Sequence, residues 1–346
     1  MDARADSPLG LHRVIGQPNV LPQPAEQLDA QMPCQSTEFE IAVERLHIDA
    51  SSLRQLRHEH HGDLDAVRAA LLELVRRRGK LHNPVTNSGG MLCGVVRAVG
   101  AAYRSPPVIG TRVASLASLT LTPLRLDELG AIDPQSNSVT ARGTAFLFQS
   151  SPWTPLPQDI PEPVAMAAFD VAGAPARVRA RTIPGSRVLV VGAGNSGSLA
   201  AIAAAEAGAA TVLVADINAE RLRSIAEIGL PVVRPVQADA TDAVSFAARV
   251  GEPVDLCVSC VDRAGVEPAC ILATRPGGHI VFFSMATDFS RAALSAEGVG
   301  SGATLEIGNG LCPGHADFVV DLLRRHPALW GILAPERPLR PGSWQP

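Results

Sequence analysis

The clearest pattern of apolar and polar positions lies in residues 187–216. A short β-branched run at 187–191 is followed by a glycine-rich turn, an alanine-rich stretch that stops at Gly208, and a second apolar run that ends at Asp216. Strands buried on both faces of a parallel sheet appear in a sequence as such continuous apolar runs, and a helix connects them. The pattern predicts a strand, a helix and a second strand.

The alternation of strands and helices continues towards the C-terminus. Further candidate strands lie at 232–236, 254–261, 279–283 and 304–307. With the first two they make six, the full set of a doubly wound Rossmann sheet. Residues 314–330 have the spacing of an amphipathic helix, and the proline-rich end of the chain is expected to form a loose tail.

The N-terminal half has a different periodicity. Residues 39–43 alternate as a half-buried strand does, a polar turn is expected at 49–52, and 63–79 place apolar side chains on one helical face. Further β-like runs lie at 95–99, 111–121 and 143–149. We therefore expect an α/β protein with a β-rich catalytic domain at 1–160, a Rossmann domain at 161–315, and a C-terminal helix and tail at 316–346.

The turn after the first Rossmann strand has the spacing Gly192-x-Gly194-x-x-Gly197. In this context the glycines allow a tight turn and close approach of a pyrophosphate, and the helix N-terminus offers free N–H groups. Asp216 stands where a carboxylate accepts hydrogen bonds from the adenosine ribose, and it would repel a 2′-phosphate. The cofactor predicted is NAD. Further contacts are expected from residues within the turn and at later strand ends: Asn195, Ser196, Ile217, Arg221, Asp239, Cys260, Ser284 and Met285.

Composition narrows the classes of partner. The 346 residues are 46% hydrophobic and carry a formal net charge of −4, which predicts neither nucleic acid nor a membrane as a partner. The N-terminus lacks the apolar core of a signal peptide, so a cytoplasmic protein with reduced cysteines is expected. Cys257 and Cys260 lie in an apolar strand run with no second pair at finger spacing, and we predict no metal.

Longer stretches of the chain carry a family resemblance. They are HRVIGQPNVLPQPA at 12–25, RGKLHNPVTNSGGML at 78–92, SLTLTPLRLDEL at 118–129, FDVAGAPARV at 169–178 and FFSMATDFSRAALSAEGVG at 282–300. Together they resemble the L-erythro-3,5-diaminohexanoate dehydrogenases, a zinc-free family with the medium-chain dehydrogenase/reductase architecture and a GroES-like N-terminal domain. The resemblance implies NAD-dependent oxidative deamination in lysine fermentation, giving 5-amino-3-oxohexanoate and ammonia. Asn87 departs from the glycine expected in the NPVTGSGG-like loop.

The chemistry of amine oxidation suggests which side chains act. A carboxylate can take the proton from a bound ammonium and later activate water. Asp49 is the leading candidate, since it follows the first strand where zinc-containing relatives of this architecture place a cysteine ligand, although it could instead cap the following turn. Asn83, Thr86 and Ser88 are expected to orient substrate. Asp170 and Glu297 could hold a second ammonium, or could be helix-end charges.

Other functions stay open at this point. A zinc-free reductase of a carbonyl or alkene, or a catalytically idle NAD-binding redox sensor, would share the glycine turn. The substrate expected from the family is a diamino or β-amino acid. A homodimer is also expected, through the apolar run HIVFFSM and the strand ATLEIG, which could continue a sheet across a two-fold axis.

Overall fold

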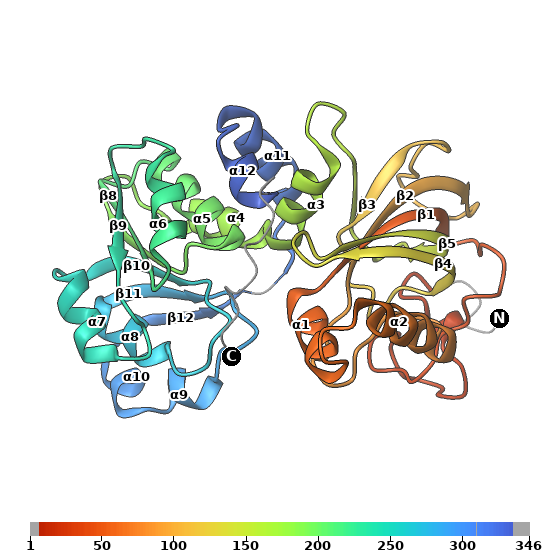
Figure 1. Cartoon of the computed structure of the whole chain (residues 1–346), viewed down its shortest axis with the longest axis horizontal. Coiled ribbons are helices and arrows are strands. Elements are labelled where there is room, and N and C mark those ends of the chain that lie inside the picture. The colour runs from red at the N-terminus through yellow and green to blue at the C-terminus, as the bar shows by residue number, and fades with distance from the viewer. Residues whose placement is uncertain (1–6, 309, 335–346) are drawn as a thin grey trace. The chain divides into compact units, whose positions relative to one another are not determined.

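The computed structural model describes residues 7–308 and 310–334. The chain divides between Met166 and Ala167 into two compact units, and the boundary falls inside helix α3 (Glu162–Val171). Each unit contains one six-stranded sheet (Figure 1). Within the part of the chain that is described, no helix is long and apolar enough to span a bilayer.

The first unit is built on an antiparallel sheet with the strand order β4-β5-β1-β2-β3-β6. The central strand β1 pairs with β2 on one side and β5 on the other. Helices α1 and α2 lie beside this sheet (Figure 1), and their apolar side chains belong to the same core as those of β1. The elements are η1 (Leu11–Arg13), β1 (Glu38–Ile48), α1 (Ala50–Glu59), α2 (Leu64–Arg78), β2 (Gly90–Val99), β3 (Arg112–Ser115), β4 (Leu124–Asp133), β5 (Ser138–Phe148) and β6 (Trp153–Pro155).

Two expectations for this unit are wrong. The predicted polar turn at 49–52 is the start of helix α1, because the Asp49 side chain caps that helix by accepting hydrogen bonds from the backbone N–H groups of Ser51 and Ser52. Strand β4 was not among the β-like runs. Its burial alternates irregularly because its pairing with β5 contains two register shifts, so the period of two that marks a half-buried strand is lost.

Ion pairs tie the start of α3 to the sheet of the first unit. The Glu162 carboxylate accepts from Arg45 Nε at 2.6 Å, and it also pairs with Arg112. These cations hold the pKa of Glu162 below its usual value despite burial, which acts in the opposite direction.

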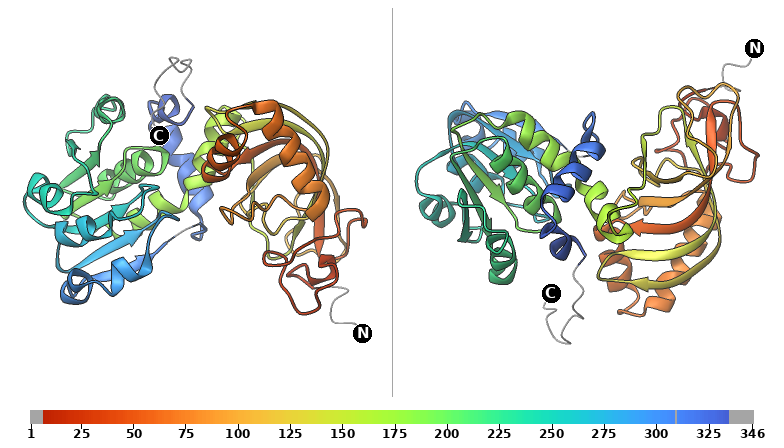
Figure 2. Two further views of the ribbon diagram at one scale, coloured as in Figure 1. Left: turned by 60° about the horizontal axis from the view of Figure 1, so that its bottom comes forward. Right: turned by 90° about the horizontal axis from the view of Figure 1, so that it is seen from above.

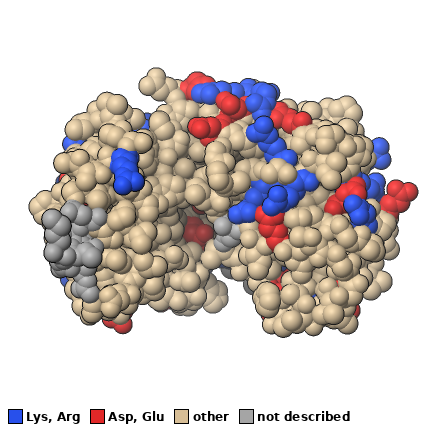
Figure 3. All heavy atoms as spheres, turned by 180° about the vertical axis from the view of Figure 1, so that it is seen from behind, with Lys and Arg blue, Asp and Glu red and all other residues tan. Residues whose placement is uncertain are grey.

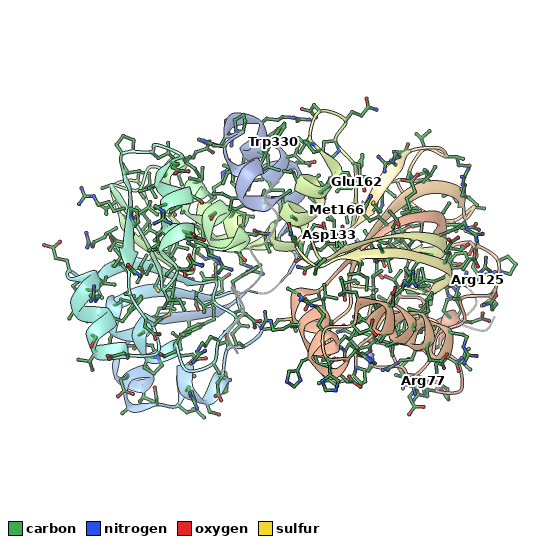
Figure 4. The ribbon with its side chains drawn as sticks, in the orientation of Figure 1. Arg77, Arg125, Asp133, Glu162, Met166 and Trp330 are labelled. Carbon is green, nitrogen blue, oxygen red and sulfur yellow. The ribbon has the colours of Figure 1, made fainter. Side chains whose placement is uncertain are left out.

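Figure 4 labels Glu162 on α3 and Asp133 at the end of β4. Basic and acidic side chains also lie next to one another on the face shown in Figure 3.

The second unit confirms the predicted Rossmann sheet of six strands. All neighbours are parallel, in the order β12-β11-β10-β7-β8-β9 (Figures 1 and 2). The elements are α4 (Gly173–Arg181), β7 (Arg187–Val191), α5 (Asn195–Glu206), β8 (Thr211–Asp216), α6 (Ala219–Ala226), β9 (Val233–Gln237), α7 (Ala243–Val250), β10 (Val254–Ser259), α8 (Glu267–Ala273), β11 (Thr274–Phe282), α9 (Phe289–Ala293), α10 (Ala296–Gly300), β12 (Thr304–Ile307), α11 (His315–Arg325) and α12 (Leu329–Leu333).

The apolar runs of the central strands are explained by burial on both faces. Successive residues of β7 from Val188 to Val191 are all buried. Leu189 and Val191 belong to the core beneath α7 and α8, and α5 packs against β7 and β8. The predicted helix at 314–330 is divided into α11 and α12. Most of the predicted tail, from residue 335 onwards, lies outside the described residues.

Candidate active site

The glycine turn joins β7 to α5. Gly192 has a φ of +103°, a conformation that favours glycine, and Gly194 caps the helix. A Cβ on Gly197 would lie 1.7 Å from the carbonyl oxygen of Gly192, so the helix passes the turn at a distance that excludes any larger residue. Two of the three glycines are thus required by the fold of the turn itself.

Gly194 is different, because nothing in the protein would touch a Cβ built on it. Its φ is also negative, so neither the backbone nor a neighbouring atom calls for glycine. The space beside it lies at the start of α5, where backbone N–H groups lack helical partners and attract an anion. A ligand that approached the backbone closely at this point would account for this glycine. The turn therefore fits the pyrophosphate of a dinucleotide.

Asp216 lies at the end of β8, beside the glycine turn. Its Oδ2 accepts from the backbone N–H of Ala193 at 2.7 Å, and its Oδ1 accepts from that of Asn218 at 2.8 Å. A carboxylate oxygen can accept a second hydrogen bond, so both oxygens can still bind ribose hydroxyl groups. Arg221 approaches Oδ2 to 4.0 Å and is largely exposed. The positive charge of Arg221 would partly offset the repulsion between Asp216 and a 2′-phosphate.

Other predicted cofactor residues follow the carboxyl ends of the strands, the edge at which doubly wound sheets bind ligands. Asp239, two residues after β9, binds the N–H and hydroxyl of Thr241, which lower its pKa. Cys260 follows β10, and burial raises its pKa to about 12. The other predicted cofactor residues at this edge are half-buried or exposed: Asn195, Ser196, Ile217, Ser284 and Met285.

In the first unit, Asp49 is held in one orientation by donors that all bind a single carboxylate oxygen. Its Oδ1 accepts from the Ser51 N–H at 2.9 Å, the Ser51 hydroxyl at 2.5 Å and the Ser88 hydroxyl at 3.1 Å. Among the described residues, Oδ2 has no hydrogen-bond donor. The capping role considered from the sequence is therefore present, and it leaves the other oxygen for a ligand.

Hydroxyl groups continue from Asp49 as a connected network. Ser88 Oγ lies 2.6 Å from Ser52 Oγ, which lies 2.7 Å from Thr86 Oγ1. Thr86 and Ser88 hydroxyl oxygens are themselves 2.9 Å apart. Ser52 and Ser88 are buried, whereas Thr86 is half-buried. Two of the three predicted substrate residues thus meet Asp49 through hydroxyl groups from α1 and from the connection between α2 and β2.

The third, Asn83, has its amide occupied by the protein. Its Nδ2 donates to Gln55 Oε1 at 2.8 Å, and its Oδ1 accepts from the Val85 N–H at 2.9 Å. The bond to Gln55 links α1 to residues 82–90, which we call the substrate loop because the three predicted substrate residues lie on it. Gly90 is the last residue of this loop, and a Cβ on it would lie 2.1 Å from the His47 carbonyl oxygen. The substrate-binding role of Asn83 stays a prediction.

The departure at Asn87 has a structural reason. Its φ is +53°, in the left-handed region, which asparagine adopts more readily than most residues other than glycine. Its Oδ1 lies 2.7 Å from His82 Nε2, and burial lowers the pKa of His82. Asparagine therefore keeps the backbone that glycine would allow and adds one contact.

The remaining predicted acids belong to the second unit. Asp170 is half-buried near the end of α3, and Glu297 is exposed in the first turn of α10. Their roles as ammonium anchors stay predictions. Among the described residues no group of three or more His, Cys, Asp or Glu side chains could hold a metal ion.

Sequence reasoning missed Ser51, Ser52 and Gln55, because 49–52 was interpreted as a turn. An acid followed by two serines and then an apolar helical pattern is a typical helix start, and that pattern could have placed these side chains on the first turns of α1.

Comparison with known proteins shows to which family the chain belongs. The profile of the L-erythro-3,5-diaminohexanoate dehydrogenase N-terminal domain matches residues 12–157. The L-erythro-3,5-diaminohexanoate dehydrogenase of Fusobacterium nucleatum is 39% identical over 329 residues, covering 92% of this chain and 95% of that protein. The chain belongs to the L-erythro-3,5-diaminohexanoate dehydrogenase family. The family member of the same name from Acetoanaerobium sticklandii is also 39% identical, over 91% of this chain and 94% of its own length.

Solved structures show the fold of this family member. An alcohol dehydrogenase from Thermotoga maritima aligns with a TM-score of 0.57 at 14% identity, over 87% of this chain and 85% of its own. One from Aeropyrum pernix aligns with a TM-score of 0.56 at 14% identity, over 90% and 88%. The architecture is that of medium-chain dehydrogenases, with a GroES-like and a Rossmann domain, as the sequence predicts.

Proposed function

We propose that this chain oxidatively deaminates L-erythro-3,5-diaminohexanoate, or a close β-amino acid, to 5-amino-3-oxohexanoate and ammonia, as in lysine fermentation, with NAD as the oxidant. The observation that carries the proposal is the 39% identity to two proteins of that name over more than nine-tenths of the chain. The glycine turn and the carboxylate of Asp49 supply the two kinds of chemistry that this oxidation needs.

NAD is favoured over NADP by Asp216, whose negative charge would repel a 2′-phosphate. Gly192, Gly194 and Gly197 with the start of α5 would hold the pyrophosphate. A nicotinamide bound there would supply the hydride acceptor for the oxidation at C3 of the substrate.

The chain's own residues handle protons and water. Asp49 Oδ2 takes a proton from the substrate ammonium, which leaves a neutral amine able to release the hydride. Once the hydride has left and Asp49 has released that proton to solvent, the carboxylate takes a proton from the water that attacks the iminium carbon. Asp49 then returns this proton to the amino group, and ammonium departs as the ketone forms. Ser88, Ser51 and the capped N-terminus of α1 keep Oδ1 fixed, so that Oδ2 points consistently. Thr86 orients substrate, and Asp170 and Glu297 hold the second ammonium.

We also propose a homodimer in the cytoplasm, formed through β12. This strand is at the edge of the sheet, and its Ile307 is 64% exposed. Residues 279–282 of the run HIVFFSM belong to β11, whose two edges are occupied by β10 and β12, so of the two predicted segments β12 is the one with an open edge.

The test is an assay of diamino and β-amino acids with NAD and NADP, following both the reduced cofactor and released ammonia. Turnover of 3,5-diaminohexanoate with stoichiometric ammonia supports the proposal. Reduction of carbonyls or alkenes without ammonia, or NAD binding without turnover of any amine, would replace it. Chelators should leave activity intact, and stoichiometric zinc by elemental analysis would contradict the proposed metal-free chemistry.

A further inference from the structure

Lysine occurs once in this chain. Of the 30 lysine and arginine residues, 29 are arginine, and the exception is Lys80, between α2 and the substrate loop. Its side chain is completely buried. Lysine is among the residues least often buried, because an ammonium loses its hydration there. A buried lysine in a chain that otherwise uses arginine points to a specific requirement at this position.

The partners of the Lys80 ammonium are backbone carbonyls. Its Nζ donates to the carbonyl oxygens of Pro22 and Gln23, each at 2.7 Å. Among the described residues no carboxylate pairs with it. A buried charge normally has an opposite charge as its partner. Lys80 instead binds the main chain of a proline-rich segment that is far away in the sequence.

This segment, residues 20–28, is held against the base of the substrate loop by further contacts. The Leu28 N–H donates to the Arg78 carbonyl at 2.9 Å, and Arg78 Nε donates to the Glu26 carbonyl at 3.1 Å. A Cβ on Gly79 would lie 1.9 Å from the Leu28 carbonyl oxygen. Arg78 Nη1 also donates to the carbonyl of His82, the first residue of the loop, at 3.2 Å.

We propose that Lys80 is a positioning residue for the substrate: its ammonium fastens the segment 20–28 beneath the substrate loop and so fixes Thr86 and Ser88 beside Asp49. The proposal rests on the proposed function, since it takes the loop as the substrate site. A compact ammonium can bind two adjacent carbonyls in a closed space, whereas the planar guanidinium of arginine presents its donors in a wider fork.

The charged state of Lys80 gives the proposal a pH dependence. Burial lowers the pKa of Lys80 to about 8, and Arg78 on the preceding helix contributes in the same direction. The neighbouring titratable group on the loop is His82, whose pKa burial lowers, and Glu26 on the facing segment contacts Arg78 through its carbonyl. Above pH 8 the amine becomes neutral, and its hydrogen bonds to the carbonyls become weaker than the charge-assisted ones.

The experiment compares Lys80→Met with Arg77→Met in the full-length enzyme. Methionine keeps the apolar stem and removes the donors, and Arg77 provides the control because it is an exposed cation of α2, labelled in Figure 4. We expect Lys80→Met to raise KM for the diamino acid roughly tenfold while kcat changes less, as loss of substrate positioning requires. Hydrogen exchange of residues 82–90 should become faster in Lys80→Met, and NAD affinity should not change.

Two further measurements keep the proposal testable. Lysine labelled with ¹³C and ¹⁵N gives one side-chain signal in this chain, so its titration can be followed directly in the wild type, even if Lys80→Met does not fold. Exchange of the loop should increase, after correction for intrinsic rates, with the same midpoint as that signal. Unchanged KM and loop exchange in Lys80→Met, or a loop that does not respond to the titration, would overturn the proposal. Failure of the wild type to oxidise any diamino acid would refute the proposed function, and the exchange data would still decide the role of Lys80.

Discussion

The glycine turn after β7 and the substrate loop before β2 both place closely packed glycines beside a carboxylate, but they are specified differently. The turn and Asp216 come from one continuous stretch of 25 residues, 192–216, and Asp216 binds the Ala193 N–H within it. The proposed substrate site draws on three separate segments, namely 20–28, the start of α1 and the loop 82–90. The proposed dinucleotide site is thus encoded locally, whereas the proposed substrate site depends on long-range contacts.

The largest effects are expected from two glycine substitutions in the turn. One should lower the free energy of unfolding, and the other should lower the affinity for NAD. In Gly197→Val the new side chain meets the Gly192 carbonyl, so we expect the free energy of unfolding to fall by about 3 kcal/mol, the upper end for an overpacked site. Gly194→Val should keep its stability to within about 1 kcal/mol and lose NAD affinity, since its side chain points into open space. Thermal unfolding and calorimetric titration with NAD check both. Tight NAD binding by Gly194→Val would show that the pyrophosphate does not lie there.

Asp49→Asn tests the corresponding carboxylate of the substrate site. Asparagine can still accept at Oδ1 and cap α1, so the fold and NAD affinity should be kept, while kcat falls roughly a hundredfold, as is typical for a lost general acid/base. Steady-state kinetics and calorimetric titration with NAD measure the two quantities.

Asp170→Asn and Glu297→Gln are the controls for this variant. Anchors for a second ammonium should raise KM more than they lower kcat. If kcat stays near normal in Asp49→Asn and collapses in either control, Asp49 is only a helix cap.

The two regions differ in how well the sequence predicts them, because one is formed by local contacts and the other by contacts between distant segments. The glycine spacing and the position of Asp216 define the turn, because each residue contacts neighbours within one βαβ unit. In the first unit the sequence proposed Asp49, Thr86 and Ser88 as candidates, partly through the family resemblance, and the structure brings the three together. The sequence did not reveal Ser52, which joins them, or Lys80, because the contacts of these residues depend on how distant segments pack.

Cofactor preference is expected to change by a smaller factor. Asp216→Asn removes the charge that would repel a 2′-phosphate, and Arg221 is already 4.0 Å from Oδ2. We expect the ratio of kcat/KM for NAD over NADP to fall about tenfold, equivalent to about 1.4 kcal/mol. Steady-state kinetics with both cofactors measure it. A wild type that uses NADP better than NAD would contradict the role given to Asp216.

The smallest effect is expected at Asn87. Like Gly192 in the glycine turn, this residue of the loop has a positive φ. Asn87→Gly allows the same φ of +53° and removes the contact with His82 Nε2. The lost hydrogen bond costs about 1 kcal/mol, and the glycine also makes the unfolded chain more flexible. Stability should therefore fall by about 1 kcal/mol, with kcat/KM within about threefold of the wild type, because 0.6 kcal/mol corresponds to that factor. Asn87→Ala is the matched variant, since alanine also loses the contact but is strained at positive φ. If Asn87→Ala were as stable and active as Asn87→Gly, stability and activity would not depend on a residue that tolerates a positive φ at this position. The loop would then differ in this respect from the glycine turn.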